Sequence, residues 1–440
     1  MATLQAVPGM NDLLPRVSAP AGAESWLHVE RWRHLEQTFF SHASRYGFSE
    51  VRPPLCEYTD LFSRGVGDTT DIVEKEMYTF EDRGGRHLSL RPEGTASAVR
   101  AALEHNALAR EPVVRWAYAG PMFRAERPAK GRYRQFHQVG AELYGDASPA
   151  ADAEMIALAA GFLSALGVNA FRVRVNSLGT RASRKVYRDA LIAHFTPQLD
   201  ALSPESQSRL QRNPLRILDS KDPRDIAAKA GAPSLTDSLS AEDQAHFAAV
   251  CAMLDALGVP YTVDPSLVRG LDYYTRTVFE IVDVSGALGA QDALGGGGRY
   301  DDLFADLGAA QPVPAVGFAM GIERLLLAAP EASVPRATRV AVVAAARADE
   351  QAVLGAALAL ARDLRGAGVE THVDTRFGSM KSQMRRANDL KVDYVFVLGG
   401  NEVAAGTVSL KTMADDVAPE AKQVTLTRAE AIARVLPASR

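Results

Sequence analysis

Two extended segments, residues 113–124 and 134–145, flank a short charged loop at about 127–133 and predict an antiparallel hairpin. Alternate residues of a strand share a face, so Val139, Ala141 and Leu143 form an apolar set that must face a core. The opposite face of this segment carries Arg134, Phe136, Gln138, Gly140 and Glu142. That polar face either meets solvent, the commoner case for an antiparallel sheet, or lines a binding pocket.

The hairpin carries a local surplus of positive charge. From Arg115 to Arg134 the chain has six Arg or Lys residues and a single acid, Glu126, although the formal net charge of the whole chain is −4. The overall charge excludes a generally basic nucleic-acid coat. The surplus therefore indicates either a local polyanionic partner or a well-solvated surface.

Four residues near the loop favour a nucleotide. Phe136 offers a flat ring on which a base can stack, and Gly140 leaves room for close approach to the sheet. Arg124 and Glu126 share a face of the preceding strand. A guanidinium binds phosphate in bidentate geometry, and a carboxylate accepts from an exocyclic amine. These residues shift the balance from a solvated face to a pocket.

Length and composition bound the class of protein. A chain of 440 residues is too long for one core, which predicts two or three domains. Cys56 and Cys251 are far apart and form no CxxC pair, which excludes a disulfide framework and a cysteine-rich zinc site. We expect a reducing cytoplasm, with neither export nor a membrane span, because the sequence has no signal-peptide pattern and no long apolar run.

Hydrophobic periodicity organises the first part of the chain. Residues 24–46 predict a helix, because large apolar residues recur there at three- and four-residue steps. Further helices are expected at Thr95–Leu108 and 151–167, and a strand at 171–178. Between about Thr180 and Gly258, helical segments alternate with polar, proline-containing turns. We interpret residues 180–258 as a helical insertion within a main domain of residues 1–329.

The last part of the chain has a different pattern. Residues 330–338 are polar and contain prolines, the composition of a linker. Residues 339–440 alternate strand and helix patterns, which predicts a compact α/β module. Its segment 376–391 carries five basic residues and one acid, so it is either a solvated helix face or a nucleic-acid contact.

Two more clusters surround glycines. LVRGLDYYTRTVFE at 267–280 contains Arg269, Asp272, Tyr273 and Tyr274, and by itself predicts a turn that leads into a strand. LGGGGRYDDL contains the glycine run 295–298 but is neither a dinucleotide motif nor a Walker A motif, because position 300 is Tyr and no GK[ST] follows. It is either a flexible loop or a place where backbone approaches a ligand closely.

The fourth cluster, AVGFAMGIERL, predicts an extended run that ends at Gly317, then a turn and a helix that presents Arg324. An arginine early in a helix opposes the helix dipole, so it does not serve helix stability. Arg324 either pairs with Glu323 or another acid, or it binds an anion.

In this order, the clusters resemble those of the class II histidyl-tRNA synthetases. The resemblance covers essentially the whole chain, from GMNDLLP at 9–15 to the last module. FRAE at 123–126, followed by Arg132 and Phe136 in RYRQF, is similar to class II motif 2, and GFAMGIERL is similar to motif 3. RGLDYYTRTVFE and GGGGRYD resemble the signatures that are specific to histidine. The segment RVSAPAGAE at 16–24 is longer than the usual connection.

The resemblance implies a role for each matching residue. Arg124 would bind the α-phosphate of ATP, Glu126 the adenine amine, and Arg132 and Arg324 the outer phosphates, while Phe136 would stack on the base. The residues implied in histidine binding are Glu93, Thr95, Gln138, Glu142, Arg269, Tyr273, Tyr274 and, at the pocket edge, Tyr300. The catalytic residues would be Arg269 and Arg124, which supply positive charge where two anions react.

The resemblance also implies an α+β fold, namely an antiparallel sheet flanked by helices, with a helical insertion and a C-terminal α/β anticodon-binding domain. The activity implied is that of a cytoplasmic, homodimeric histidine–tRNA ligase. Its substrates would be L-histidine, ATP with Mg²⁺, and tRNA(His), and neither a protein-ligated metal nor a membrane is expected. Arg127, Lys130 and Arg134 would be candidates for contact with the acceptor end of the tRNA.

Two other classes of protein compete with this interpretation. A regulatory paralogue that senses histidine or partners a phosphoribosyltransferase is expected to lack the anticodon module and the catalytic arginines, whereas this chain keeps both. A plain RNA- or nucleotide-binding protein would not need Arg269, Tyr273 and Glu142 together.

Overall fold

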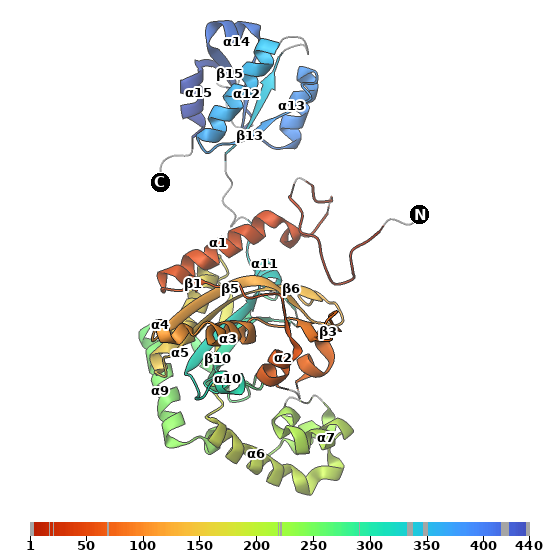
Figure 1. Ribbon diagram of the computed structural model, residues 1–440, viewed down its shortest axis with the longest axis vertical. Coiled ribbons are helices and arrows are strands. Elements are labelled where there is room, and N and C mark those ends of the chain that lie inside the picture. Colours follow the sequence, from red (N-terminus) through yellow and green to blue (C-terminus); the bar gives the residue numbers. More distant parts are fainter. Residues whose placement is uncertain are drawn as a thin grey trace. The chain divides into compact units, whose positions relative to one another are not determined.

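The computed structural model describes residues 4–16, 18–20, 22–67, 70–218, 220, 222–289, 291–331, 338–345, 351–414 and 422–436. The chain divides into two compact units, Met1–Ser333 and Val334–Arg440 (Figure 1). Most of the expected linker, 330–338, lies outside the described ranges. None of the helices in these ranges has both the length and the apolar character needed to cross a membrane.

An eight-stranded sheet forms the centre of the first unit, with the order β1-β5-β6-β11-β10-β9-β7-β8. The strands from β5 to β7 in this order run antiparallel, and β1 and β8 join the edges in parallel. The bounds are Ser49–Glu50 (β1), Val114–Phe123 (β5), Gln135–Tyr144 (β6), Phe171–Ser177 (β7), Tyr261–Val263 (β8), Thr275–Asp283 (β9), Ala293–Arg299 (β10) and Ala315–Gly321 (β11). The predicted hairpin is β5–β6, and the predicted α+β class with an antiparallel sheet is confirmed.

One face of this sheet carries the main hydrophobic core. Val139, Ala141 and Leu143 of β6 are fully buried there, as the alternation predicts. They belong to one cluster with residues of α1 (Val29–Arg45) and α5 (Pro149–Ala165), which cover that face. Each large apolar side chain buried in this way stabilises the fold by about 1.5–3 kcal/mol.

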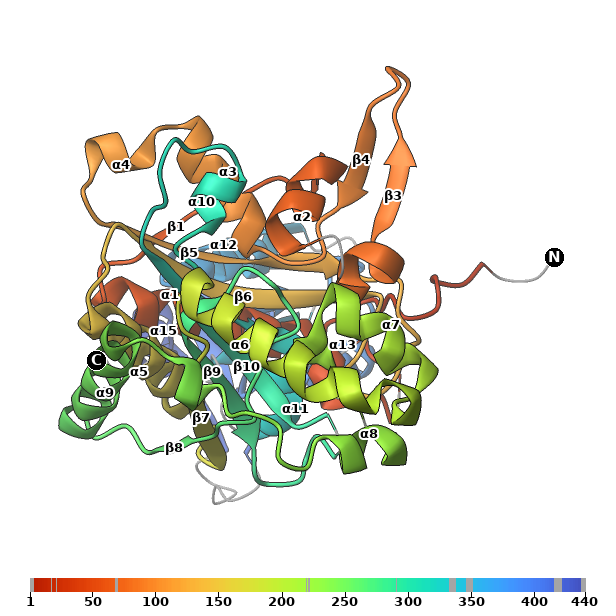
Figure 2. The same cartoon turned by 90° about the horizontal axis from the view of Figure 1, so that it is seen from below.

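Shorter elements lie near the other face. They include α2 (Thr59–Val66), α3 (Thr95–Glu104), α4 (Ala107–Arg110) and α10 (Leu303–Asp306). A small antiparallel sheet in the order β2-β4-β3 consists of Cys56–Tyr58, His87–Leu90 and Tyr78–Glu81. Its β3–β4 hairpin projects from the rest of the unit (Figure 2).

The chain between β7 and β8 is helical. It contains α6 (Arg181–Phe195), α7 (Pro204–Arg212), α8 (Pro223–Ala228) and α9 (Ala241–Ala256) with short 3-10 turns (Figure 2). Each helix begins at a residue whose side chain accepts a hydrogen bond from a nearby backbone N–H: Thr180, Ser203, Asp222 and Ser240. Side-chain caps therefore mark the start of each of the helices α6 to α9.

The second unit is a five-stranded sheet with helices, in the order β13-β12-β14-β15-β16. Its strands are Arg339–Ala344 (β12), Glu370–Val373 (β13), Tyr394–Leu398 (β14), Thr407–Thr412 (β15) and Gln423–Thr427 (β16). Its helices are Gln351–Gly366 (α12), Met380–Asp389 (α13), Gly400–Ala405 (α14) and Arg428–Val435 (α15). Sequence patterns did not predict α14 or β16, which are short.

The structure excludes one alternative for the glycine run and corrects the predicted end of the extended run that follows it. The glycine run 295–298 is part of strand β10 and not a loop, and β11 continues past Gly317 to Gly321, where α11 (Ile322–Ala328) begins. The glycines allow neighbouring groups to pack very closely. A Cβ at Gly297 would lie 2.0 Å from the carbonyl oxygen of Gly317, and a Cβ at Gly317 would lie 1.6 Å from Oε2 of Glu142.

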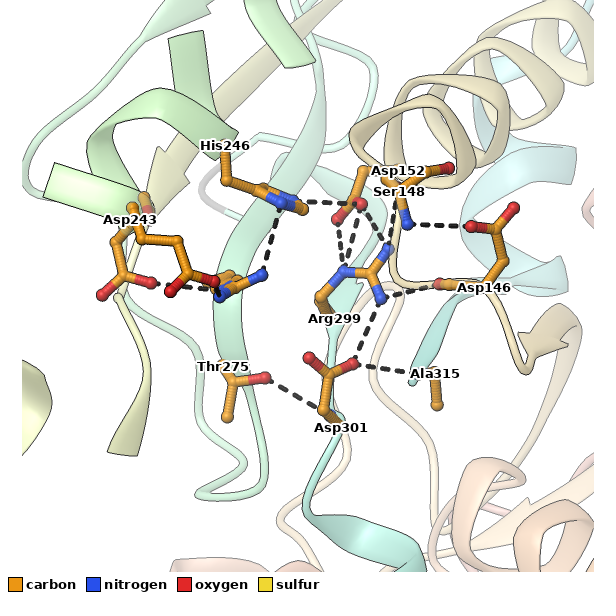
Figure 3. Close-up of polar contacts among 12 residues, drawn as sticks. Asp146, Ser148, Asp152, Asp243, His246, Thr275, Arg299, Asp301 and Ala315 are labelled. Carbon is orange, nitrogen blue, oxygen red and sulfur yellow. Dashed lines mark hydrogen bonds and ion pairs between the residues drawn. The ribbon is translucent and has the colours of Figure 1, made fainter. Parts of the chain in front are cut away.

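A buried ion pair fastens β10 to α5 (Figure 3). The Arg299 side chain is fully buried, and its Nε donates to Asp152 at 3.1 Å. Its Nη1 donates to Asp301 at 3.1 Å. Burial acts to raise the pKa of Asp152, but hydrogen bonding from His246 and the Arg299 charge outweigh it and hold that pKa below its ordinary value of 3.8.

We expect Asp152→Asn to lower the free energy of unfolding by about 3 kcal/mol at neutral pH, because the buried Arg299 guanidinium loses its closer counter-charge and is left with the longer ion pair to Asp301. The native carboxylate stabilises the fold above its ordinary pKa, and this contribution is lost as the pH falls through the lower folded-state value. The difference between wild type and variant should therefore shrink in acid. Urea unfolding monitored by circular dichroism measures it.

Glu50→Gln is the matched control, because it removes an ion pair with Arg52 that lies at the surface. Its unfolding midpoint should equal that of the wild type. An Asp152→Asn midpoint as high as that of the control would show that the buried pair does not support the fold.

Candidate active site

Residues from all four sequence clusters meet in one cavity of about 200 Å³. Those singled out from the sequence that line it are Glu93, Thr95, Arg124, Glu126, Arg132, Phe136, Gln138, Arg269, Tyr273, Tyr274 and Arg324. Glu142 and Tyr300 have exposed fractions of 0% and 1%, so they lie beneath the cavity and not at its edge.

Arg124 stacks on the predicted aromatic platform. Its Cζ lies 5.1 Å from the centroid of the Phe136 ring, and its Nε donates to the carbonyl oxygen of Pro92 at 3.0 Å. Burial lowers the pKa of Arg124, an effect opposed by the nearby carboxylates of Glu126, Glu76 and Glu93. Arginine stays protonated at any working pH, so the cavity contains a fixed positive charge against a flat ring.

The charged loop at about 127–133 is held together by contacts between its own residues. Backbone hydrogen bonds of 2.9 Å run in both directions between Ala129 and Arg132, and the half-exposed Arg132 side chain forms an ion pair with Glu126. Arg324 donates to the carbonyl oxygens of Gly131 and Ala293, each at 2.8 Å. The loop is thus attached to α11 by the arginine that the sequence singled out.

Glu323 does not pair with Arg324. Its carboxylate accepts from the backbone N–H of His137 at 2.9 Å and lies 3.1 Å from the Nδ1 atom of the same residue. Of the alternatives left by the sequence, pairing with the adjacent acid is therefore excluded. The Arg324 guanidinium remains part of the cavity wall.

Arg269 is anchored by an acid that the motif search missed. Its Nη1 donates to Oε1 of Glu280 at 2.8 Å, and Oε2 of Glu280 accepts from Arg174 at 3.2 Å. Residues 174 and 280 face each other across β7 and β9, so the alternation of each strand was the available signal. A Cβ at Gly296 would lie 2.8 Å from Cζ of Arg269, which shows why the glycine run passes here.

Glu142 is the centre of a buried hydrogen-bond cluster. Its carboxylate accepts from the hydroxyls of Thr95 at 2.8 Å, Tyr118 at 3.1 Å and Tyr300. Burial raises the pKa of Glu142 to about 8, even though the hydrogen bonds from Tyr300 and Thr95 oppose the rise. This carboxyl is therefore easily held neutral in the free protein.

Tyr118 corrects one expectation from the sequence. Gly140 does make room above the sheet, but the Tyr118 ring fills the space, since a Cβ at Gly140 would lie 2.4 Å from it. A Cβ at Gly94 would lie 2.3 Å from the same ring. Two distant glycines thus admit one tyrosine, a relation that no local pattern encodes.

Among the remaining polar residues of the cavity, some groups have hydrogen-bond partners within the described structure and one buried group does not. Glu93 accepts from the backbone N–H groups of Thr95 and Ala96 at 2.8 and 2.7 Å, and so caps α3. Oε1 of Gln138 is buried and has no hydrogen-bond partner among the described residues. The Tyr273 and Tyr274 rings are in contact, with centroids 4.7 Å apart.

The residues suggested for RNA contact are placed differently from one another. Arg127 and Lys130 are exposed, whereas Arg134 is half-buried and donates to the carbonyl oxygens of Pro8 at 3.3 Å and Glu126 at 3.2 Å. In the second unit, α13 carries the exposed residues Lys381, Arg385 and Arg386.

Comparisons with known proteins match family models to both units of the chain. Residues 27–325 match the family model described as histidyl-tRNA synthetase, and residues 339–436 match the anticodon binding domain. A histidine–tRNA ligase of Sorangium cellulosum is 52% identical over 419 residues, which cover 95% of this chain and 94% of that relative.

Two solved structures show the same architecture. The apo histidyl-tRNA synthetase of S. aureus is 32% identical with a TM-score of 0.79, and the match covers 99% of this chain and 100% of that one. An ATP phosphoribosyltransferase regulatory subunit/histidyl-tRNA synthetase from Bacillus halodurans C is 22% identical with a TM-score of 0.64, over 91% and 99% of the two chains, and shares the fold. From the matched domains and the identity over nearly its whole length, the chain belongs to the histidyl-tRNA synthetase family.

Proposed function

We propose that this chain is a histidine–tRNA ligase, which activates L-histidine with ATP and then transfers it to the 3′ end of tRNA(His). The observation that carries the proposal is the single cavity that joins four arginines and an aromatic ring to a group of buried polar side chains. The 52% identity to a protein named histidine–tRNA ligase supports it. A regulatory paralogue would not need the complete set of arginines.

In the first step, a carboxylate oxygen of histidine attacks the α-phosphorus of ATP, and pyrophosphate leaves with the electrons of the broken P–O bond. Both reactants are anionic, so fixed positive charge at the reacting atoms lowers the barrier. We assign this role to Arg124 and Arg269. Glu280 holds Arg269 in place before substrates bind, so little reorganisation is needed during the reaction.

The other ATP contacts follow from the lining residues. Phe136 stacks on the adenine, Glu126 accepts from its amine, and Arg132 and Arg324 bind the outer phosphates. A magnesium ion bound to ATP would neutralise part of the phosphate charge that these arginines also face. Within the described residues, no cluster of three or more acidic, His or Cys side chains is placed to hold a metal ion.

Histidine binds at the other end of the cavity. A neutral imidazole offers one donor and one acceptor. The Thr95 hydroxyl can meet it at the cavity wall, while Glu142, which accepts from Thr95 and Tyr300, fixes that hydroxyl from beneath. Gln138 supplies a buried acceptor, and Glu93, Thr95, Tyr273 and Tyr274 complete the pocket. A different amino acid would leave these buried groups unpaired and would therefore be rejected.

In the second step, a terminal ribose hydroxyl of the tRNA attacks the carbonyl carbon of histidyl-adenylate, and AMP leaves. We assign the anticodon end of the tRNA to the second unit, whose exposed α13 arginines suit phosphate contacts. The acceptor end is assigned to the exposed Arg127 and Lys130. As the family resemblance implies, we expect a cytoplasmic homodimer.

Purified protein should catalyse ATP–pyrophosphate exchange that depends on histidine, and Arg269→Ala should lower its rate by about 10²–10³-fold. The variant should keep a cooperative melting transition, because Glu280 retains Arg174 as a partner. Arg172→Ala, at an exposed arginine of β7, is the control. Exchange by Arg269→Ala within twofold of this control would refute the assigned role.

Glu142→Gln tests the buried carboxyl through its pH dependence. The folded state holds the proton of Glu142 up to about pH 8, while the ordinary pKa is 4.5. Between those two pH values, the wild type should therefore lose about 1.4 kcal/mol of unfolding free energy per pH unit relative to the variant. Above about pH 8 the difference between the two proteins should no longer change. Urea unfolding of both proteins without substrate measures this difference.

Glu50→Gln, at an exposed carboxylate, is the control and should track the wild type at every pH. A stability difference between Glu142→Gln and the wild type that does not change with pH would show that Glu142 titrates normally.

The double variant Arg385→Ala/Arg386→Ala tests the assignment of α13. Aminoacylation should weaken through a higher KM for tRNA, and the log–log salt dependence of tRNA binding should fall by about 1–2. Histidine-dependent exchange should stay unchanged. Arg362→Ala, an exposed arginine of α12, is the control, and an equal loss of exchange and of charging by the double variant would contradict the assignment.

A further inference from the structure

The histidine loop, residues 267–274, carries Arg269, Tyr273 and Tyr274 into the cavity but lies outside helices and strands. It therefore has no regular backbone ladder to hold it. One of its backbone groups, the N–H of Asp272, donates to the carbonyl oxygen of Val66 at 3.3 Å. The position of the two tyrosines depends on what else fixes this loop.

Arg184 on α6 of the helical insertion binds the loop directly. Its Nη1 donates to the carbonyl oxygen of Tyr274 at 2.7 Å and to that of Asp272 at 3.1 Å. These two carbonyl groups flank Tyr273. Hydrogen bonds from a charged guanidinium are stronger than those between neutral groups, so one half-buried side chain fixes the backbone on both sides of a pocket residue.

The same insertion also fastens the end of the loop. Arg276, two residues after Tyr274, has φ of +47° and exchanges backbone hydrogen bonds with Gly179 and Leu178 at 2.8 and 2.7 Å. Its Nε donates to Asp243 of α9, which also accepts from Ser183 of α6 at 2.6 Å. Nη1 of Arg276 also lies 3.5 Å from Nδ1 of His246, which Figure 3 shows beside the Asp152–Arg299 pair. The start of α6 is thereby tied to the buried network of the first unit.

We propose that Arg184 is a positioning residue for the amino-acid pocket, through which the helical insertion fixes the backbone around Tyr273. This inference rests on the proposed function, because it assigns Tyr273 and Tyr274 to histidine. The ATP residues Arg124 and Phe136 are located at the central hairpin, whose strands pair along their whole length. Loss of Arg184 should therefore affect histidine much more than ATP.

Arg184→Met keeps most of the apolar stem and removes both hydrogen bonds. In histidine-dependent ATP–pyrophosphate exchange we expect the KM for histidine to rise about 10- to 100-fold, and the KM for ATP to stay within about twofold. Arg188→Met is the matched control, since Arg188 lies one turn further along α6, is exposed and donates to the carbonyl oxygen of Gln211 at 3.2 Å. Its two KM values should equal those of the wild type.

Arg184→Lys keeps the charge and should show a smaller rise in the KM for histidine alone. If Arg184→Met has no cooperative melting transition, Arg184→Lys decides the question by the same ratio of KM values. An unchanged KM for histidine, or equal rises in both KM values, would overturn the proposal.

Hydrogen–deuterium exchange separates this inference from the proposed function. Peptides that cover residues 267–274 should exchange faster in Arg184→Met than in the wild type or in Arg188→Met, whether or not the protein is active. Unchanged hydrogen–deuterium exchange rates in these peptides would contradict the positioning role of Arg184. A wild type that lacks histidine-dependent pyrophosphate exchange would instead refute the ligase assignment.

Discussion

Several elements of the candidate site converge on the buried carboxyl group of Glu142, which accepts their hydrogen bonds. Hydroxyls from α3, β5 and the segment after β10 donate to it, and Gly317 of β11 passes close enough that a Cβ there would overlap its Oε2. A carboxyl placed in an apolar interior without such partners would cost several kcal/mol. Elements far apart in the sequence must therefore meet at one place, and their meeting forms the floor of the cavity.

The arginines of the cavity are held in place before any substrate binds. Glu280 anchors Arg269, the Phe136 ring lies against Arg124, and backbone carbonyls receive the Arg324 guanidinium. Such contacts reduce the reorganisation that a transfer reaction between two anions would otherwise require. The same arrangement explains why glycines occur in strands here, since Gly296 leaves the space that Arg269 occupies.

The helical segment between β7 and β8 contributes contacts to the candidate site, although its residue Arg184 lies apart in the sequence from the motifs that line the cavity. Arg184 binds two carbonyl groups of the histidine loop, and Asp243 binds the arginine that follows it. These contacts give an otherwise irregular segment a fixed backbone. Specificity for an amino acid depends on such fixed polar groups, because only a rigid pocket leaves the wrong ligand unpaired.

Sequence periodicity by itself determined the β5–β6 hairpin and its buried face, and the motifs identified most of the residues that line the cavity. Only the tertiary structure decided that Tyr118 covers Gly140, and that Glu142 and Tyr300 lie beneath the cavity. It also decided that the glycine run 295–298 is a strand. The contacts of Glu280 with Arg269 and of Arg184 with the histidine loop likewise appear only in the tertiary structure. The physical reason is the distance along the sequence over which each kind of interaction acts. Alternation and helical spacing reflect which face of one element is buried, whereas hydrogen bonds and close glycine contacts depend on which distant elements pack together.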